Sequence, residues 1–317
     1  MLPPCLTERT GETERFIADY DTFLLDCDGV IWSGNEAILG VAKTIQSLEN
    51  AGKRMIFVTN NSTESRSHQL AQLQKFGISC SIEQIFTSGY CTAIYLSQIL
   101  NQRSQTQKSV FVIGNPAIVS ELSEAGLSVI DPSTDAYFSE EVVLGHFEKI
   151  ATGTPLHSDV GAVVVGMDLK FNYLKLCHAM HYIRNGALFI ATNTDSTFPI
   201  FDTVFPAAGF ISAALSHTLD VKPRVMGKPS QLMMEVVKKR YDLNLRRTCM
   251  VGDRLDTDIR FGVEGGLGGT LLVLTGVCGE DDLKKAEKNA EEGTLLPTAF
   301  ARSFSVLDTE DEVSGLE

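Results

Sequence analysis

The sequence is short of basic residues and has no close cysteine pairs, no internal repeat and no long apolar run. Its 27 lysines and arginines stand against 40 aspartates and glutamates, which gives a formal net charge of −13. Proteins whose main task is to bind DNA or RNA need a basic surface, so this composition argues against a nucleic-acid partner. An anionic ligand must then be attracted locally, by a bound divalent cation and a few lysines in one cleft.

The seven cysteines are odd in number and widely scattered, and no two have CxxC spacing. This pattern is typical of reduced thiols rather than of a disulfide framework. Residues 1–15 include acidic and polar side chains where a signal peptide has an apolar core, and no stretch reaches the length of a membrane span. We therefore expect a soluble protein without a membrane partner, located in the cytoplasm with the nucleus as a second compartment.

The composition that is present, 44% hydrophobic and 21% charged, is typical of a globular protein. A chain of 317 residues exceeds the usual size of one core, so a large domain with a smaller partner is expected. Short apolar runs alternate with helical patterns, which indicates an α/β fold with a parallel sheet covered by helices. The clearest runs are Thr22–Leu25, Met55–Val58, Val110–Ile113, Val160–Val165, Leu188–Ala191, Cys249–Val251 and Thr270–Leu274.

Two polar stretches are candidate crossings between domains. Residues 101–108 (NQRSQTQK) have the composition of a linker, and residues 220–223 form a second crossing point. The run Arg224–Met226 that follows is expected to resume the sheet of the first domain. The predicted domains are a core of residues 1–101 and 222–317 and an inserted domain of residues 102–221.

Two aspartates, Asp26 and Asp28, directly follow the first apolar run. The carboxyl ends of strands are where open α/β sheets present catalytic groups. If strand geometry continues for two more residues, both carboxylates point to one side and Cys27 points to the other. One carboxylate can then attack as a nucleophile while the other acts as general acid and base. The alternative is an Asp-Gly turn that closes the strand.

A second polar group, Thr59–Thr63, follows the next apolar run. Its hydroxyl, side-chain amides and backbone N–H groups near a helix start are suited to holding phosphate. Simple N-capping by Asn61 or Ser62 is the alternative. Further along, Lys228 lies at a strand-to-helix junction, where it can neutralise developing phosphoryl charge, although most lysines are simply solvated.

A fourth loop, Gly252–Asp258, carries three carboxylates after a strand. Oxygen ligands at this density suit Mg²⁺, and Asp253 is the preferred ligand. A capped turn at a helix start is the alternative for Asp256 and Asp258. All four loops follow predicted strands of one sheet, so we expect them to converge on one edge. Independent turns have no reason to agree in this way, and the combination predicts phosphoryl-transfer chemistry.

In this order the motifs resemble those of the haloacid dehalogenase-like superfamily of phosphatases, whose signature is DxD, Thr or Ser, Lys and GDxxxxD. The stretches FLLDCDGVIWSG, FVTNNST, MGKPS and MVGDRLDTDIRFGVEGGLGGT are similar, more narrowly, to the eukaryotic 4-nitrophenylphosphatase and phosphoglycolate phosphatase branch. The resemblance covers nearly the whole chain. It implies a Rossmann-like, doubly wound core and an inserted α/β cap domain of the C2 type, residues 102–221, which closes over the core and selects substrates.

By position, the resemblance implies that Asp26 is the nucleophile and Asp28 the acid and base of a phosphomonoesterase. It also implies a Mg²⁺ ion held by the Asp26 carboxylate, the Asp28 backbone carbonyl and Asp253. Asp258 is expected to support these ligands without being one of them. The expected phosphoryl-binding residues are Thr59, Asn60, Asn61 and Lys228.

Within the cap, Asn193–Pro199 resembles the substrate-specificity loop of the family. Relatives that act on pyridoxal phosphate carry a histidine about where Phe198 stands. The resemblance therefore favours a small acidic metabolite such as 2-phosphoglycolate, bound in part by Phe198, with p-nitrophenyl phosphate as an artificial substrate. A homodimer formed through the cap domain is the expected assembly.

Three other functions are open: dephosphorylation of proteins by the same chemistry, phosphate binding by a regulator without turnover, and dehalogenation. A cap hinders a folded protein substrate, a regulator has no need of Asp28, and the acidic metal loop is superfluous for dehalogenation.

Three further features have structural interpretations. They are Cys177, His178 and His181 as helix residues, Gly265–Gly269 as a turn between helix and strand, and Trp32 as a packing residue.

Overall fold

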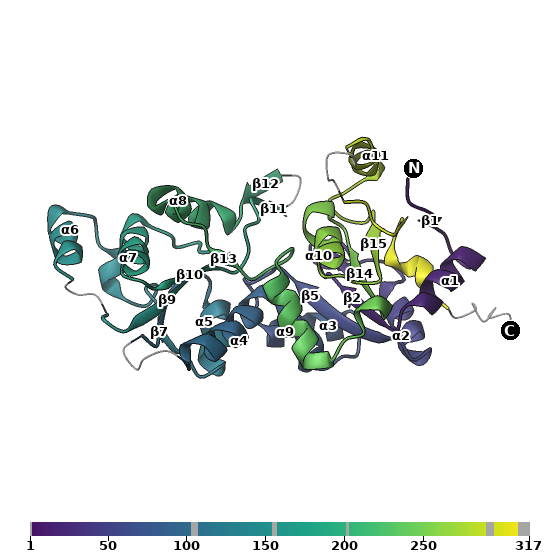
Figure 1. Cartoon of the computed structure of the whole chain (residues 1–317), viewed down its shortest axis with the longest axis horizontal. Helices are drawn as coiled ribbons and strands as arrows, with labels where there is room; N and C mark the ends of the chain where they lie inside the picture. Colours follow the sequence, from purple (N-terminus) through teal and green to yellow (C-terminus); the bar gives the residue numbers. More distant parts are fainter. Residues whose placement is uncertain (1, 103–106, 154–156, 201–202, 290–294, 310–317) are drawn as a thin grey trace. The chain divides into compact units, whose positions relative to one another are not determined.

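The computed structural model in Figure 1 describes residues 2–102, 107–153, 157–200, 203–289 and 295–309. The chain forms two compact units. Unit one comprises Met1–Thr59, Ser67–Phe86 and Val237–Glu317, and unit two comprises Asn60–Arg66 and Thr87–Val236. The inserted domain expected at residues 102–221 stays a prediction.

A seven-stranded sheet forms the centre of unit one, in the order β1-β16-β15-β14-β2-β5-β6. Its central strands pair in parallel, and all four residues of β2 are buried. Such continuous apolar strands suit a sheet whose two faces are both covered. The strands are β1 (Cys5–Leu6), β2 (Thr22–Leu25), β5 (Arg54–Thr59), β6 (Ile85–Thr87), β14 (Thr248–Gly252), β15 (Gly269–Val273) and β16 (Ala299–Ala301), with a separate hairpin of β3 (Trp32–Ser33) and β4 (Glu36–Ala37).

Helices connect these strands, as the parallel pairing requires. In α2, the buried residues Val41, Ile45 and Leu48 recur at the three- and four-residue spacing of one helical face. The helices are α1 (Gly11–Asp19), α2 (Val41–Asn50), α3 (Arg66–Lys75), α10 (Arg260–Glu264) and α11 (Glu280–Lys288), with short turns η1 (Ile82–Gln84), η3 (Leu245–Arg247), η4 (Leu255–Ile259) and η6 (Phe304–Leu307). Helix α9 (Gln231–Tyr241) begins in unit two and ends in unit one.

A five-stranded sheet, in the order β13-β10-β9-β7-β8, forms the centre of unit two. Every strand pair in it is parallel. Its strands are β7 (Ser109–Ile113), β8 (Ser128–Ile130), β9 (Val160–Val165), β10 (Leu188–Ala191) and β13 (Arg224–Val225). The other elements are α4 (Ser88–Leu100), α5 (Pro116–Glu124), η2 (Ala136–Ser139), α6 (Leu144–Ala151), α7 (Tyr173–Arg184), α8 (Gly209–Leu219) and an antiparallel hairpin of β11 (Thr197–Ile200) and β12 (Thr203–Pro206).

The structure confirms the α/β class but corrects the place of one strand. Arg224–Met226 was expected to resume the first sheet, yet β13 pairs with β10 in the second sheet. The backbone continues this pairing, because Met226 N–H donates to the Ala191 carbonyl at 2.9 Å and Gly227 N–H to the Thr192 carbonyl at 2.7 Å. A two-residue strand has too little pattern to choose its sheet, and these contacts between distant residues decide it.

The three structural interpretations are confirmed. Cys177, His178 and His181 lie in α7, and the first two are buried. Gly265–Gly269 joins α10 to β15, and Trp32 is 2% exposed within the core of unit one. All seven cysteines are free thiols. Within the described ranges, the helices are all too short or too polar to cross a membrane.

Candidate active site

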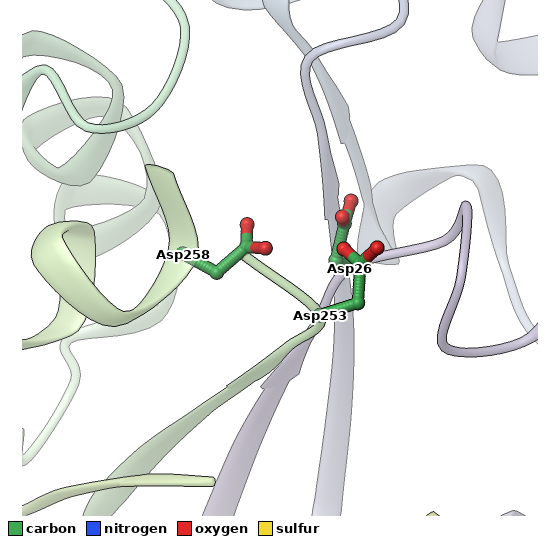
Figure 2. Close-up of side chains that lie close together, drawn as sticks. All are labelled: Asp26, Asp253 and Asp258. Carbon is green, nitrogen blue, oxygen red and sulfur yellow. The ribbon is translucent and has the colours of Figure 1, made fainter. Parts of the chain in front are cut away.

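Three carboxylates gather at the carboxyl ends of two adjacent strands of unit one. Asp26 follows β2, Asp253 follows β14, and Asp258 lies in η4 just beyond. One carboxylate oxygen of each lies within 4.8 Å of those of the other two. Figure 2 shows Asp26 and Asp253 side by side at the strand ends, with Asp258 reaching toward them from its helical turn. The sequence argument that strand ends bring Asp26 and Asp253 to one edge is confirmed.

Strand register explains why these residues meet. Val251 of β14 is level with Leu25 of β2, and each strand ends at the residue directly before its aspartate. The ladder continues past the strand end, because Asp26 N–H donates to the Val251 carbonyl at 2.9 Å. On the other side of β2, β5 ends at Thr59, whose side chain is 1% exposed. Asp26, Asp253 and Thr59 thus follow or end three neighbouring parallel strands.

The Asp253 side chain is enclosed by backbone. Its Oδ2 accepts a hydrogen bond from Val277 N–H at 2.7 Å. A Cβ on Gly276 would lie 2.0 Å from this oxygen, and one on Gly29 would lie 2.5 Å from it. Gly29 also has φ +80°, which disfavours other residues. Both glycines are therefore needed to let the chain close around this carboxylate.

The Asp258 carboxylate is held in a similar way. Its Oδ2 accepts a hydrogen bond from Arg254 N–H at 3.1 Å, and a Cβ on Gly252 would lie 2.1 Å from the Asp258 Cβ. Asp256 differs, because it is exposed and outside the cluster. Partial burial raises its pKa, but the Arg254 guanidinium and the backbone N–H groups of Asp256 and Thr257 together more than offset this, so the pKa of Asp256 is lowered overall. The turn interpretation suits Asp256, whereas Asp258 joins the cluster.

The donor set of this cluster fits Mg²⁺. Asp26, Asp253 and Asp258 are 8%, 3% and 0% exposed, and carboxylates so close together in a buried site repel one another. A divalent cation removes this repulsion, and hard oxygen ligands are the type that Mg²⁺ prefers. Among the described residues, these three form the one group of carboxylates, histidines or cysteines close enough to share a metal ion.

Asp28 lies outside this cluster. Strand β2 ends at Leu25, and the chain then turns, because the Cys27 carbonyl accepts hydrogen bonds from the N–H groups of Val30, Ile31 and Trp32. The alternation expected through Asp28 therefore does not persist. Asp28 is exposed, and its Oδ1 accepts a hydrogen bond from the indole Nε1–H of Trp32 at 3.0 Å.

In unit two, the side chain of Asn60 joins two other segments. Its Nδ2 donates to the Lys228 carbonyl at 3.1 Å and lies 3.3 Å and 3.4 Å from the two carboxylate oxygens of Asp195. The Asn60 carbonyl accepts from Ser88 Oγ at 2.8 Å and from Asn193 Nδ2 at 2.9 Å. The amide orientation follows from this network, because turning it over would place Oδ1 against three acceptors.

The neighbouring residues of the same loop have their own partners. Asn61 Oδ1 accepts from the N–H and the hydroxyl of Thr63, both at 2.8 Å, and Ser62 Oγ lies 3.1 Å from Thr192 Oγ1. Helix α3 begins only at Arg66, so neither Asn61 nor Ser62 is its N-cap. The capping alternative for this loop is therefore wrong.

Lys228 is 2% exposed, so the solvated-lysine alternative is also wrong. Gly227 before it has no room for a side chain, since its Cβ would lie 2.6 Å from Asn60 Oδ1 and 2.7 Å from the Thr192 carbonyl. Lys228 follows β13 of the second sheet, which corrects the expectation that all four loops follow strands of one sheet. Phe198 lies in β11, half-buried, with its ring 6.1 Å from that of Phe205 in β12.

Sequence reasoning missed several partners of the expected site residues, among them Asp195, Asn193 and Trp32. Asp195 and Asn193 contact Asn60 across more than 130 positions, and Trp32 contacts Asp28. Asp195 and Asn193 were noticed only as members of a loop, and Trp32 only for its packing. Of these contacts, only the one between Asp28 and Trp32 had a local signal in the sequence, namely their four-residue spacing around Gly29.

Comparison with known proteins gives a consistent result. Residues 23–128 match a family model described as haloacid dehalogenase-like hydrolase, and residues 225–300 match one described as HAD-hydrolase-like. The chain is 39% identical to the 4-nitrophenylphosphatase of Schizosaccharomyces pombe, over 93% of this chain and 96% of that protein. It is 38% identical to the chloroplastic phosphoglycolate phosphatase 1A of Arabidopsis thaliana, over 90% of this chain and 77% of that protein.

A solved structure extends the comparison to the fold. The glycerol phosphate phosphatase of Mycobacterium tuberculosis, in complex with magnesium, is similar with a TM-score of 0.71 and 29% identity. The match covers 93% of this chain and 78% of that chain.

Proposed function

The chain belongs to the haloacid dehalogenase-like hydrolases, and we propose that it is a Mg²⁺-dependent phosphomonoesterase acting through an aspartyl-phosphate at Asp26. The observation that carries the proposal is the cluster of Asp26, Asp253 and Asp258 at adjacent strand ends. The phosphatases among the relatives support the reaction class. The further roles assigned below rest on the sequence motifs.

In the first step, a carboxylate oxygen of Asp26 attacks phosphorus and the bond from phosphorus to the ester oxygen breaks. The leaving oxygen takes a proton from the Asp28 carboxyl group. In the second step, Asp28 takes a proton from water, and the water oxygen attacks the phosphorus of the aspartyl-phosphate. The bond from phosphorus to Asp26 breaks, which releases inorganic phosphate and regenerates both aspartates.

The metal site would be formed by the Asp26 carboxylate, the Asp28 backbone carbonyl and Asp253, with Asp258 in support. A bound Mg²⁺ supplies charge neutralisation for the phosphoryl oxygens. Two features of the chain support this assignment: the buried carboxylate cluster, and the glycines that enclose Asp253. The expected phosphoryl-binding residues are Thr59, Asn60, Asn61 and Lys228.

The burial of Lys228 supports its role, since a lysine with 2% exposure needs an anionic or polar environment. Its backbone is fixed by Asn60, whose amide donates to the Lys228 carbonyl. In this geometry the Asn60 side chain holds the loop that carries Lys228. Lys228 and Asn60 would act on the phosphoryl group when it is bound.

The substrate class follows from the relatives and from Phe198. The related proteins are named for 4-nitrophenyl phosphate, phosphoglycolate and glycerol phosphate, all small molecules. A phenyl ring at position 198 offers an apolar contact and no proton, which disfavours pyridoxal phosphate. We place 2-phosphoglycolate-like metabolites first and protein substrates or regulation without turnover as alternatives. The cap-mediated homodimer and the cytoplasmic location stay predictions.

The test is turnover of a panel that holds 2-phosphoglycolate, glycerol phosphate, pyridoxal phosphate, p-nitrophenyl phosphate and a phosphoserine peptide. We expect Mg²⁺-dependent release of phosphate from the small acidic esters, and no release with EDTA. Asp253→Asn should abolish turnover, whereas Asp256→Asn in the same loop should leave it near the wild-type level. Phosphate binding without turnover of any ester would favour the regulator.

A further inference from the structure

Trp32 is the only tryptophan of the chain, and it joins the core of unit one to Asp28. Its side chain is 2% exposed, and its ring lies 5.8 Å from the ring of Phe76 in a tilted arrangement. The indole has one polar atom, the Nε1–H, which can only donate. This donor is directed at Asp28 Oδ1 at 3.0 Å.

The turn between the two residues holds them in this relation. The Cys27 carbonyl accepts three N–H groups, from Val30, Ile31 and Trp32, and Gly29 N–H donates to the Trp32 carbonyl at 2.7 Å. Gly29 has φ +80°, a conformation that other residues rarely adopt. The position of the indole N–H is thus fixed both by the buried ring of Trp32 and by the backbone hydrogen bonds of the turn.

We propose that Trp32 is a positioning residue for Asp28. The inference rests on the proposed function, in which Asp28 transfers protons. The buried indole N–H holds Oδ1 of this exposed carboxylate in one place, and a side chain that is ordered in advance loses less conformational entropy at each turnover. The indole holds Oδ1 in advance, so that Oδ2 is the oxygen presented to the leaving group and later to water. Proton transfer depends strongly on such placement.

The leaving group provides a readout that loss of packing does not change. 4-Nitrophenolate leaves readily without a proton, whereas an alkoxide needs one. Trp32→Phe keeps an aromatic ring in the core and removes the N–H together with the five-membered ring that carries it. We expect it to lower kcat/KM for an alkyl phosphate about tenfold and kcat/KM for p-nitrophenyl phosphate less than about threefold, with KM changed little for either. The matched control is Phe76→Leu, which loosens the same packing and keeps the N–H.

The contact itself has an independent readout. Because Trp32 is the only tryptophan, a ¹⁵N-labelled protein gives one indole N–H resonance, and Asp28→Ala should shift it upfield by removing the acceptor. An unmoved indole resonance, or equal losses for alkyl and aryl esters in Trp32→Phe, would overturn the proposal. A selective loss for alkyl esters in Phe76→Leu would also overturn it. If the wild type hydrolysed no ester, the proposed function would fall and the positioning role with it, while the resonance would still report whether the contact exists.

Discussion

At the scale of single residues, the carboxylate cluster depends on backbone that approaches unusually closely. Gly276 is the sharpest case, because a Cβ there would overlap Asp253 Oδ2 at 2.0 Å. Backbone cannot move aside as the end of a flexible side chain can. An added methyl group must therefore displace Asp253.

We predict that Gly276→Ala weakens Mg²⁺ binding about tenfold, the size of effect seen when the support of a metal ligand is removed. Isothermal titration calorimetry of the metal measures this directly. Gly279→Ala is the control, since open space surrounds that position and its affinity should match the wild type. Equal affinities for the two variants would contradict the account.

His178 is a second informative residue. Burial, reinforced by His181, His146 and His157, lowers its pKa from 6.5 to about 4, against an opposing effect of Asp135. Its Nε2 lies 3.2 Å from Tyr137 Oη, and within the described ranges Nδ1 has no hydrogen-bond partner. The folded state therefore keeps the ring neutral where the unfolded chain already binds a proton.

The depressed pKa sets the sign of the pH dependence. The contribution of neutral His178 to the free energy of unfolding is complete above about pH 6.5 and is lost as the pH falls toward 4. Between pH 7.5 and 5 this single group should account for a loss of about 2 kcal/mol in the free energy of unfolding. Urea unfolding at both pH values measures it. Between the same two pH values, His178→Phe should lose about 2 kcal/mol less than the wild type. An equal loss in the two proteins would rule out His178 as the cause.

At the scale of elements, the first residue of α3, Arg66, is bound to α5 within unit two. Glu121 Oε1 accepts from Arg66 N–H at 2.8 Å, and its Oε2 accepts from Arg66 Nε at 3.1 Å. The guanidinium also lies 3.6 Å from the centroid of the Tyr90 ring in α4. Glu121 is 4% exposed, so removing its charge leaves the Arg66 guanidinium poorly compensated.

We expect Glu121→Gln to lower the free energy of unfolding by about 3 kcal/mol, the lower end for breaking a buried pair. Chemical unfolding followed by circular dichroism provides the measurement. Glu280→Gln removes an exposed partner of Lys284 and should change stability by less than about 0.5 kcal/mol. Similar effects for both variants would show that burial does not govern this pair.

At the scale of the whole molecule, the long apolar strands were predictable from the sequence. The pairing of a short strand and the contacts between residues far apart in the chain were not. Thr22–Leu25 and Thr248–Gly252 are buried parallel strands, so their pattern and the position of Asp26 and Asp253 after them follow from the sequence. The two-residue strand Arg224–Val225 was assigned to the wrong sheet, because its partner β10 lies more than 30 positions away and leaves no local mark. The contact of Asn60 with Asp195, 135 positions apart, was invisible for the same reason.

Turns also limited the prediction. The argument for Asp28 assumed that β2 continues, whereas β2 ends at Leu25 and the Cys27 carbonyl accepts the hydrogen bonds of a turn. The place of the Asp28 carboxylate beside Asp26 stays a prediction. Asp258 joined the metal cluster because η4 turns it back toward the strand end, a local geometry that spacing alone does not specify.

The central claim is that phosphate passes through a covalent bond to Asp26. Rapid acid quenching of the protein during turnover of a ³²P-labelled phosphate ester, followed by peptide mapping, tests it most directly. We predict label on the peptide that contains Asp26 in the wild type, and neither label nor turnover in Asp26→Asn. Label on another residue, or undiminished hydrolysis by Asp26→Asn, would contradict the account.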